Sequence, residues 1–446
     1  MREIGSRLEL FVDDWLIESM DNAALKLHSP TPPETALTFD APWEGLNSNC
    51  ISVFEDEGRF RMYYRGMGHD EDSSPQQKTC YAESQDGIRW QKPSLGFYEF
   101  EGSRDNNITY WHGPGTHNLT PFKDANPACV ESQRYKAVAA DWQTDVRGLI
   151  GLVSPDGFHW QLATEKPMIT EGAFDTQNVA FWDAEQGQYV VYIRDWIAEK
   201  IRTIRRSTSP DFINWTTPEW LDFGSAPAEE LYTNAITPYF RAPHIYLGFP
   251  MRFMQHRRVV ADHEDIGISD ACFMSSRDGL QWDRRFLEAF IRPGRDLRNW
   301  TDRNFIVGVG QLQTAPDEIS LFWVENYSHP TCHACRGTLR LDGFVSINAG
   351  YGGGEVLTRP LTFSGKELVI NYATSAPGSI EVEIQDAMGH PLPGLTMDEA
   401  TAIYGDEIEH VVQFVSGSDL SGLAGHPVRL RFVMKDADLY SLRFRP

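Results

Sequence analysis

A short recurring phrase constrains the fold of this chain more than any other feature. The phrase has the form Ser-x-Asp-Gly-x-x-Trp and is complete at residues 84–90, 154–160 and 276–282. A degenerate copy occupies residues 209–215, and a fragment remains at 341–345. The aspartates of successive copies are 55 to 70 residues apart. A phrase that returns at near-regular spacing is typical of a repeat architecture.

The residue types of the phrase are those of a tight turn. Aspartate caps a turn with its own side chain, and glycine adopts the positive φ that a hairpin requires. The tryptophan begins the next strand and offers a large apolar face. Each copy therefore predicts a hairpin between the two outer strands of a small sheet. A ligand-binding loop is the alternative, but turn residues that repeat with a fold are usually structural.

The strands around these turns can be aligned from one repeat to the next. In each repeat the most legible strand is aromatic or β-branched and ends in a charged residue. These second strands are residues 60–65, 135–141, 189–194, 245–252 and 319–325. Residues 40–350 show no long helical periodicity. Four strands in each of five units predict an all-β fold, a five-bladed β-propeller over residues 1–350.

The pattern changes after the glycine-rich tract at residues 351–354, which we expect to be a hinge. Four further strand-like segments follow, at residues 368–372, 379–384, 410–414 and 428–433. Turns such as residues 391–394 separate them. This spacing predicts a β-sandwich over residues 355–446 with its own core.

Charge and composition exclude several classes of partner. The formal net charge of −23 argues against nucleic acid or an anionic membrane surface. No apolar run is long enough for a membrane span, and the first ten residues lack the apolar core of a signal peptide. The six scattered cysteines suit a reducing compartment. We expect a cytoplasmic protein, with secretion as the alternative if a signal peptide has been removed.

Five blades followed by a sandwich resemble glycoside hydrolase family 32, and the propeller alone resembles families 43, 62, 68, 117 and 130. The repeated phrases and the end of the sandwich at residues 435–440 carry this resemblance. The Trp-Met-Asn-Asp-Pro-Asn-Gly opening of family 32 is replaced by Pro42-Trp43-Glu44-Gly45-Leu46-Asn47. The Arg-Asp-Pro and Glu-Cys motifs of that family are absent. The resemblance implies a glycan-related function without naming a substrate.

In a propeller, residues at the start of each innermost strand face the central funnel. Glycoside cleavage needs two carboxyl groups across the scissile bond, and a third often tunes the acid. We favour Glu230 as proton donor, Asp124 or Asp175 as base or nucleophile, and Glu44 as a further candidate. Solvated or turn carboxylates are the structural alternative in a chain with 63 acidic residues. Other polar residues expected at the funnel, as substrate-binding groups, are His117, Asn178, Tyr232, Asp302 and Arg303.

Three arginines, Arg65, Arg194 and Arg252, occupy equivalent positions at the ends of aligned second strands. Guanidinium groups that converge on a funnel rim can bind carboxylate, sulfate or phosphate. This would indicate a uronate or sulfated sugar as substrate, or phosphate as co-substrate. The alternative is that each arginine pairs with a neighbouring carboxylate and holds the blades together.

A single Cys-x-x-Cys with adjacent histidines lies at residues 329–335. A second ligand pair at suitable spacing is missing, so the sequence predicts no metal and no cofactor. The hypothesis we favour is a glycoside hydrolase acting on chain ends or oligosaccharides. The alternatives are an inverting glycoside phosphorylase with an arginine-rich phosphate site and a non-catalytic glycan-binding propeller. A homo-oligomer is compatible with all three.

Overall fold

The computed structural model describes residues 1–67, 77–141, 147–197, 200–263 and 265–446. These residues form two compact units. The propeller unit comprises Pro30–Ala315 and Ile319–Thr338, and the terminal unit comprises Met1–Ser29, Pro316–Glu318 and Leu339–Pro446. None of the helices in the described ranges has the length and apolar character needed to cross a membrane.

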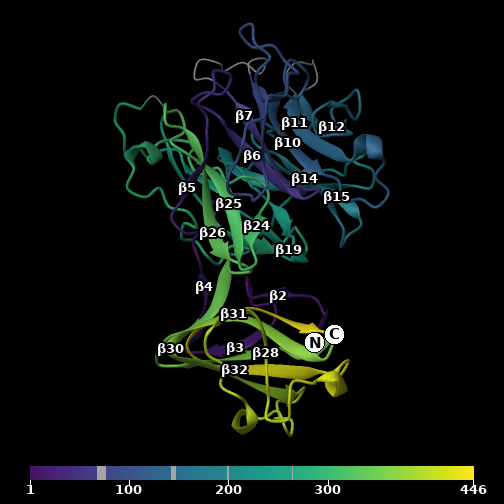
Figure 1. Cartoon of the computed structure of the whole chain (residues 1–446), viewed down its shortest axis with the longest axis vertical. Coiled ribbons are helices and arrows are strands. Elements are labelled where there is room, and N and C mark those ends of the chain that lie inside the picture. The colour runs from purple at the N-terminus through teal and green to yellow at the C-terminus, as the bar shows by residue number, and fades with distance from the viewer. Residues whose placement is uncertain (68–76, 142–146, 198–199, 264) are drawn as a thin grey trace. The chain divides into compact units, whose positions relative to one another are not determined.

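Five four-stranded sheets in the described part of the propeller unit form the five blades expected from the repeat (Figure 1). Blade one contains β6 (Asn49–Asp56), β7 (Arg59–Gly66), β8 (Lys78–Ser84) and β9 (Ile108–Tyr110). Blade two contains β10 (His117–Lys123), β11 (Tyr135–Asp141), β12 (Gly148–Ser154) and β13 (Gln161–Leu162). Blade three contains β14 (Val179–Asp183), β15 (Gln188–Ile197), β16 (Ile201–Ser209) and β17 (Glu219–Trp220).

Blades four and five depart from this simple order. Blade four contains β18 (Thr237–Tyr239), β19 (Ala242–Gly248), β22 (Met274–Ser276) and β23 (Trp282–Asp283). A separate ladder joins β20 (Met251–Met254) to β21 (Ile268–Ala271). Blade five contains β24 (Leu312–Ala315), β25 (Glu318–Glu325), β26 (His333–Arg340) and, from the N-terminal part of the chain, β5 (Glu34–Thr38). Short 3₁₀ turns in the two units are η2 (Glu131–Gln133), η4 (Leu297–Asn299), η5 (Met397–Glu399) and η6 (Ser421–Leu423).

The repeated phrase is a turn, as the sequence predicts. Oδ1 of Asp86 accepts hydrogen bonds from the backbone N–H groups of Ile88 and Arg89, both at 2.8 Å. Asp156, Asp211 and Asp278 accept equivalent pairs in the next three copies. These carboxylates are therefore committed to turn geometry, which explains why their regular spacing carries no catalytic meaning.

The fifth blade is closed by the N-terminal strand β5. It pairs antiparallel with β26, with Thr38 opposite His333 and Glu34 opposite Arg336. A hydrogen bond of 2.8 Å from the backbone N–H of Thr31 to the carbonyl of Thr338 continues this pairing. The sheet of the last blade is therefore completed by the beginning of the propeller segment, and β5 is its outer strand.

The terminal unit is one hydrogen-bonded network of ten strands. Its strands are β1 (Arg2–Gly5), β2 (Glu9–Leu10), β3 (Ile17–Asp21), β4 (Ala23–Leu27), β27 (Val345–Ala349), β28 (Gly354–Thr358), β29 (Leu361–Phe363), β30 (Glu367–Asp386), β31 (Asp406–Val411) and β32 (Val428–Arg445). The segments 368–372 and 379–384, expected as two strands, are parts of the single strand β30. A register shift between Thr374 and Ser379 interrupts its pairing with β32. The sandwich itself stays a prediction.

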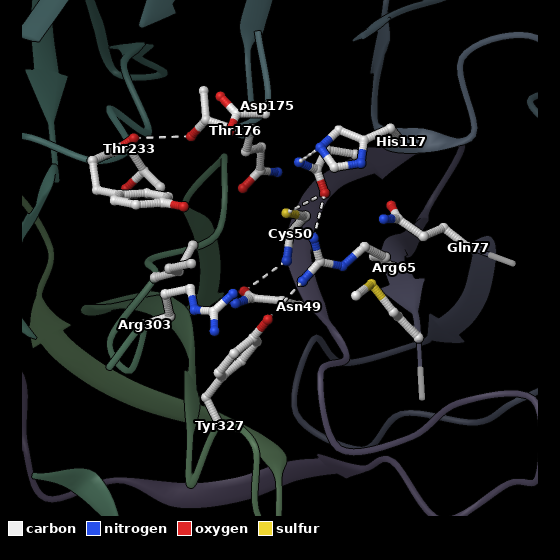
Figure 2. A pocket seen from close by; sticks show the side chains of 15 residues that line it. Asn49, Cys50, Arg65, Gln77, His117, Asp175, Thr176, Thr233, Arg303 and Tyr327 are labelled. Carbon is white, nitrogen blue, oxygen red and sulfur yellow. Dashed lines mark hydrogen bonds between the residues drawn. The ribbon is translucent and has the colours of Figure 1, made fainter. Parts of the chain in front are cut away.

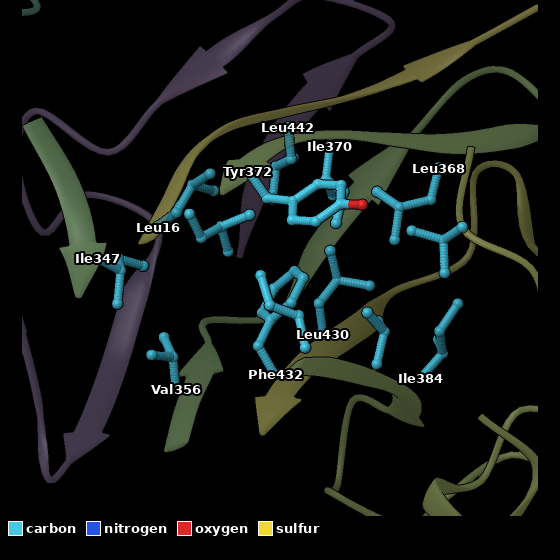
Figure 3. Packing of buried hydrophobic residues seen from close by; sticks show 14 of the residues in the cluster. Leu16, Ile347, Val356, Leu368, Ile370, Tyr372, Ile384, Leu430, Phe432 and Leu442 are labelled. Atoms are coloured by element: carbon cyan, nitrogen blue, oxygen red, sulfur yellow. The ribbon is translucent and has the colours of Figure 1, made fainter. Parts of the chain in front are cut away.

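One apolar cluster lies inside the terminal unit (Figure 3). Alternate residues of β30, including Leu368, Ile370 and Tyr372, are buried against Leu430 and Phe432 of β32. Ile4, Phe11 and Leu16 from the N-terminal segment belong to the same cluster. The expected boundary near residue 350 is therefore wrong in one respect: the first 29 residues share the core and sheet of the C-terminal segment.

Candidate functional site

A cavity of about 160 Å³ lies in the propeller unit and is lined by residues from all five blades (Figure 2). Its lining residues are Asn49, Cys50, Arg65, Met67, Gln77, His117, Asn118, Asp175, Thr176, Gln177, Tyr232, Thr233, Arg303, Ile306 and Tyr327. Polar groups outnumber apolar ones in this set. The cavity is therefore suited to a ligand rich in hydrogen-bonding groups.

A backbone irregularity at the start of the inner strands gives the cavity its lining. Cys50 and Asn118, the second residues of β6 and β10, have φ of 57° and 55°, and the pairing register shifts just after each. Ala235 and Phe305 have φ of 43° and 61° at the matching positions of blades four and five. Such left-handed residues are uncommon outside glycine and cluster at functional sites. The preceding residues of blades one and two, Asn49 and His117, both line the cavity.

Arg65, at the end of β7, is the most unusual cation of the cavity. Its Nη1 donates to Oδ1 of Asn118 at 2.7 Å, and its Nη2 donates to the carbonyl of Asn47 at 2.9 Å and to the hydroxyl of Tyr327 at 3.2 Å. No ion pair joins it to a carboxylate among the described residues, and its Nε is buried without a partner there. Neutral acceptors thus hold the guanidinium in place and leave its charge available to an anion.

Arg303 lies across the cavity from Arg65 in Figure 2, with Tyr327 between them. Its guanidinium carbon is 5.0 Å from the centre of the Tyr327 ring. Two carboxylates, Asp265 at 2.6 Å and Asp302, pair with it. Asp302 also contacts Nε2 of His263 at 2.9 Å and does not line the cavity. Asp302, which was expected to bind substrate, therefore positions Arg303 and does not line the cavity.

Asp175 is the one carboxylate among the described residues that lines the cavity. It lies in the loop before β14, its side chain is 49% exposed, and it pairs with the buried Arg194 of β15. The guanidinium carbon of Arg194 is 4.8 Å from the Tyr232 ring. A neighbouring guanidinium favours the ionised form of a carboxylate, and this form accepts a proton or attacks as a nucleophile.

Glu230 lies in the wall beside these groups. It is 8% exposed, its Oε2 pairs with Arg202, and its Oε1 is buried without a partner among the described residues. The guanidinium carbon of Arg202 is 4.9 Å from the Tyr232 ring, so the two arginines flank one aromatic side chain. Glu230 is therefore close to the Asp175 group without lining the cavity itself.

His117 is held neutral. Burial, together with the positive charges of Arg65 and Arg194, lowers the pKa of His117 to about 3. Its Nε2 contacts the amide nitrogen of Asn118 at 3.0 Å. At neutral pH this side chain can exchange hydrogen bonds with a ligand but adds no charge to the cavity.

Besides Asp302, Glu230 and Arg194, four more of the expected residues do not line the cavity. Asp124 follows the opposite end of β10 from His117, roughly 20 Å along the strand, where it pairs with Lys136 at 2.6 Å. Glu44 is buried between Lys92, at 2.7 Å, and the hydroxyl of Tyr64. Asn178 is fully buried, and its amide donates to backbone carbonyls.

Arg252 is the fourth of these residues. It forms two hydrogen bonds with Asp270, at 2.9 and 2.7 Å, and an ion pair with Glu229 at 3.0 Å. Its alignment with Arg65 and Arg194 is wrong because β19 ends at Gly248, and Arg252 belongs to the separate strand β20. Pro250, just before β20, has no N–H with which to continue the ladder. Arg252 therefore pairs with neighbouring carboxylates, which is the structural alternative that the sequence left open.

Sequence reasoning missed Cys50, Gln77, Thr176, Gln177, Thr233 and Tyr327 as lining residues. A signal for part of this set is visible in the chain. A polar residue stands two positions before isoleucine or leucine in Asn49-Cys50-Ile51, His117-Asn118-Leu119 and Asn234-Ala235-Ile236. Each triplet marks the start of an inner strand.

No protein family model and no curated protein matches the chain. Among solved structures, a complex of BT0996 with RGII is 11% identical with a TM-score of 0.47, and the match covers 71% of this chain and 93% of the other protein. A structure from the GH130 family of mannoside phosphorylases and glycoside hydrolases that target β-1,2-mannosidic linkages in Candida mannan is 14% identical, with a TM-score of 0.44 and coverages of 75% and 96%.

A fructofuranosidase variant from Schwanniomyces occidentalis, complexed with fructosylnystose, extends over more of the chain. It is 9% identical with a TM-score of 0.43, and the match covers 92% of this chain and 96% of the other protein. At such low similarity these structures do not bear on the chemistry of the cavity.

Proposed function

We propose that this protein cleaves glycosidic bonds in a glycan that carries an anionic group. One observation carries the proposal: a single exposed carboxylate, Asp175, shares a polar cavity with Arg65, a guanidinium without a carboxylate partner among the described residues. The carboxylate supplies acid–base or nucleophilic chemistry, and the guanidinium binds the anion. The resemblance of the repeat architecture to glycoside hydrolases agrees with this chemistry.

Hydrolysis requires a second carboxyl group. Glu230 is the best candidate because it lies beside Tyr232, whose ring contacts both Arg194 and Arg202. In this proposal Asp175 acts as base or nucleophile and Glu230 as proton donor. The anionic group is a uronate or sulfate on the sugar, bound by Arg65.

Phosphorolysis is the second candidate, because only Asp175 lines the cavity among the described carboxylates. A phosphorylase needs one acid and a cationic site for phosphate, and Arg65 with Arg303 could provide that site. The anion that Arg65 binds would then be the co-substrate and not part of the sugar.

The test is a screen of neutral, uronate-containing and sulfated oligosaccharides, each with and without inorganic phosphate. Release of free sugar without phosphate supports hydrolysis, and a sugar phosphate formed only with phosphate supports phosphorolysis. Asp175→Asn should abolish either activity, and Glu230→Gln should abolish hydrolysis. The matched control Asp105→Asn changes an exposed aspartate and should keep full activity.

Full activity of Asp175→Asn would overturn the proposal. Saturable binding of an oligosaccharide without any turnover by the wild-type protein would also overturn it, in favour of a glycan-binding propeller. Near-ultraviolet circular dichroism of each variant separates loss of chemistry from loss of folding.

A further inference from the structure

Three side chains of blade five converge on a second cavity. They are Glu325 at the end of β25, and His333 and Cys335 at the start of β26. One ligand atom from each lies within 4.8 Å of the other two, and Nε2 of His333 is 3.2 Å from Sγ of Cys335. This cavity of about 600 Å³ shares no lining residue with the central one in the described chain.

The strand pattern explains why these three groups meet. His333 and Cys335 are two positions apart in β26, so their side chains leave the same face of the strand. The connection from Glu325 to His333 is a short loop, residues 326–332, which returns the chain beside the end of β25. Cys332, the other cysteine of the Cys-x-x-Cys motif, instead donates from its Sγ toward the carbonyl of Ser48 at 3.6 Å.

The hydrogen bonds behind these groups fix their donor atoms. Nδ1 of His333 contacts the carbonyl of Thr331 at 2.8 Å. A carbonyl only accepts, so Nδ1 carries the proton and Nε2 presents a lone pair toward Cys335. Both oxygens of Glu325 also accept hydrogen bonds. Oε1 accepts from the indole N–H of Trp323 at 2.9 Å, and Oε2 accepts from the amide of Asn299 at 2.8 Å. Outer contacts of this kind orient metal ligands.

We propose that Glu325, His333 and Cys335 form a zinc site whose fourth coordination position opens into the 600 Å³ cavity. An imidazole nitrogen, a thiolate sulfur and a carboxylate oxygen are the donor types that zinc binds in proteins. The thiolate disfavours magnesium and calcium, which prefer oxygen ligands alone. A Cys-x-x-Cys zinc site commonly uses a second Cys or His pair, whereas here the third donor is a glutamate of the neighbouring strand.

Binding exchanges one proton for the metal. In the metal-free state the thiol of Cys335 faces Nε2 of His333. Zinc takes up the thiolate and the lone pair of Nε2, and the thiol proton passes to solvent. Zinc affinity should therefore rise with pH.

The site also bears on the central cavity. Glu325 and His333 bracket the loop that carries Tyr327 and Ser328. The Tyr327 hydroxyl accepts a hydrogen bond from Arg65 at 3.2 Å, and the Ser328 hydroxyl donates to Oδ1 of Asn47 at 2.7 Å. A zinc ion that joins the two ends of this loop would hold Tyr327 against Arg65 without touching the ligand.

The test uses the untagged full chain, stripped with a chelator and titrated with Zn²⁺ or Co²⁺. The expected result is one tightly bound zinc per chain, and a thiolate-to-cobalt charge-transfer band with Co²⁺. Cys335→Ser should remove that band, and Cys335→Ser and His333→Gln should each weaken zinc binding at least tenfold. His333 is only partly buried, so its variant is expected to fold.

The matched control is Cys332→Ser, a change in the same loop and cavity that should keep both the zinc and the band. Absence of zinc binding by the wild-type chain would overturn the proposal. Unchanged affinity in Cys335→Ser, or loss of zinc from Cys332→Ser alone, would also overturn it. None of these measurements depends on the enzymatic activity proposed above.

Discussion

The hydroxyl of Tyr192 in blade three donates a hydrogen bond of 2.9 Å to the carbonyl of Gly279 in the turn of blade four. Gly157 in the turn of blade two also lies close to Tyr63 of blade one, because a Cβ at Gly157 would lie 2.4 Å from the Tyr63 hydroxyl. The glycine of the repeated phrase is therefore required for two reasons. It adopts a positive φ, and its lack of a side chain lets the neighbouring blade approach.

Gly279→Ala should destabilise the protein by about 3 kcal/mol. The left-handed backbone costs alanine roughly 1–2 kcal/mol, and the collision with Tyr192 adds a further ~1–3 kcal/mol. The control is Gly58→Ala, which has the same φ of 77° but nothing within 4 Å, and should lose only about 1 kcal/mol. Urea denaturation measures both, and equal losses would contradict the role of the blade contact. Tyr192→Phe should relieve part of the Gly279→Ala defect.

The degenerate third copy of the phrase has Phe212 in place of glycine. In blade two, which precedes this copy, Val138 occupies the position that Tyr63 and Tyr192 occupy in blades one and three. Val138 and Phe212 belong to one apolar cluster. Phe212 thus fills the volume that a tyrosine fills elsewhere. Phe212→Ala should cost about 3–5 kcal/mol of unfolding free energy.

The double variant Val138→Tyr/Phe212→Gly tests this exchange. Its loss of stability should be smaller than the summed losses of the two single variants, because the tyrosine then enters the space that the phenylalanine leaves. Additive losses in a double-mutant cycle would show that the two positions do not compensate each other.

Acid should weaken the turns of the propeller. Burial alone would raise the pKa of Asp156, but hydrogen bonds from the backbone and side chain of His159 lower it to about 2. Because this pKa is below its ordinary value of 3.8, the carboxylate stabilises the fold above about pH 4, and this contribution is lost as the pH falls toward 2. Asp156→Asn should flatten the pH dependence of the unfolding midpoint in that window. An unchanged slope would contradict the low pKa.

His117 should remain uncharged far below pH 6.5. Burial and the nearby Arg65 and Arg194 lower its pKa to about 3, so the folded state binds this proton only in strong acid. The unfolded state binds it near pH 6.5, so the contribution of His117 to stability declines as the pH falls from 6.5 toward 3. Its imidazole NMR signals should not shift between pH 7 and pH 5, and titration near pH 6.5 would contradict the cationic surroundings described here.

Arg65→Gln should weaken binding of sulfate or phosphate to the cavity by about 10- to 100-fold, the range for loss of charged hydrogen bonds. Isothermal titration with each anion measures the effect. The control is Arg298→Gln, an exposed arginine paired with Asp296, which should bind anions as the wild type does. Equal anion affinity in Arg65→Gln and wild type would remove Arg65 from the proposed site.

The repeat could be predicted from the sequence because it is written in local turn chemistry. Asp86 and Gly87 determine their own hairpin, and the same residue types recur at fixed positions relative to the second strands. The partner of β26 could not be predicted in this way. β5 lies some 300 residues away along the chain, and its sequence, Glu34-Thr35-Ala36-Leu37-Thr38, lacks the aromatic residues that mark the other strands.

The candidate site was predicted less completely. Arg65, Asp175, His117, Tyr232 and Arg303 do line one cavity, whereas Asp124 and Glu44 do not. The prediction for Asp124 was wrong because an inner strand brings only its first residues to the cavity, and Asp124 follows the last residue of its strand. The prediction for Glu44 was wrong because Glu44 pairs with Lys92, which is 48 residues away in the chain. Pairings of this range depend on the assembled blades and leave no local pattern.

The closing strand β5 also has a consequence for synthesis of the chain. Glu34 leaves the ribosome about 300 residues before its partner Arg336, a delay of roughly 15–60 s at 5–20 residues per second. Throughout that interval β5 is an unpaired strand that other chains could join. Two features limit this risk: Pro30, Pro32 and Pro33, just before β5, cannot donate to a ladder, and Glu34 at the start of β5 adds charge. We therefore expect the proline-rich segment before β5 to limit such pairing until the last blade is made.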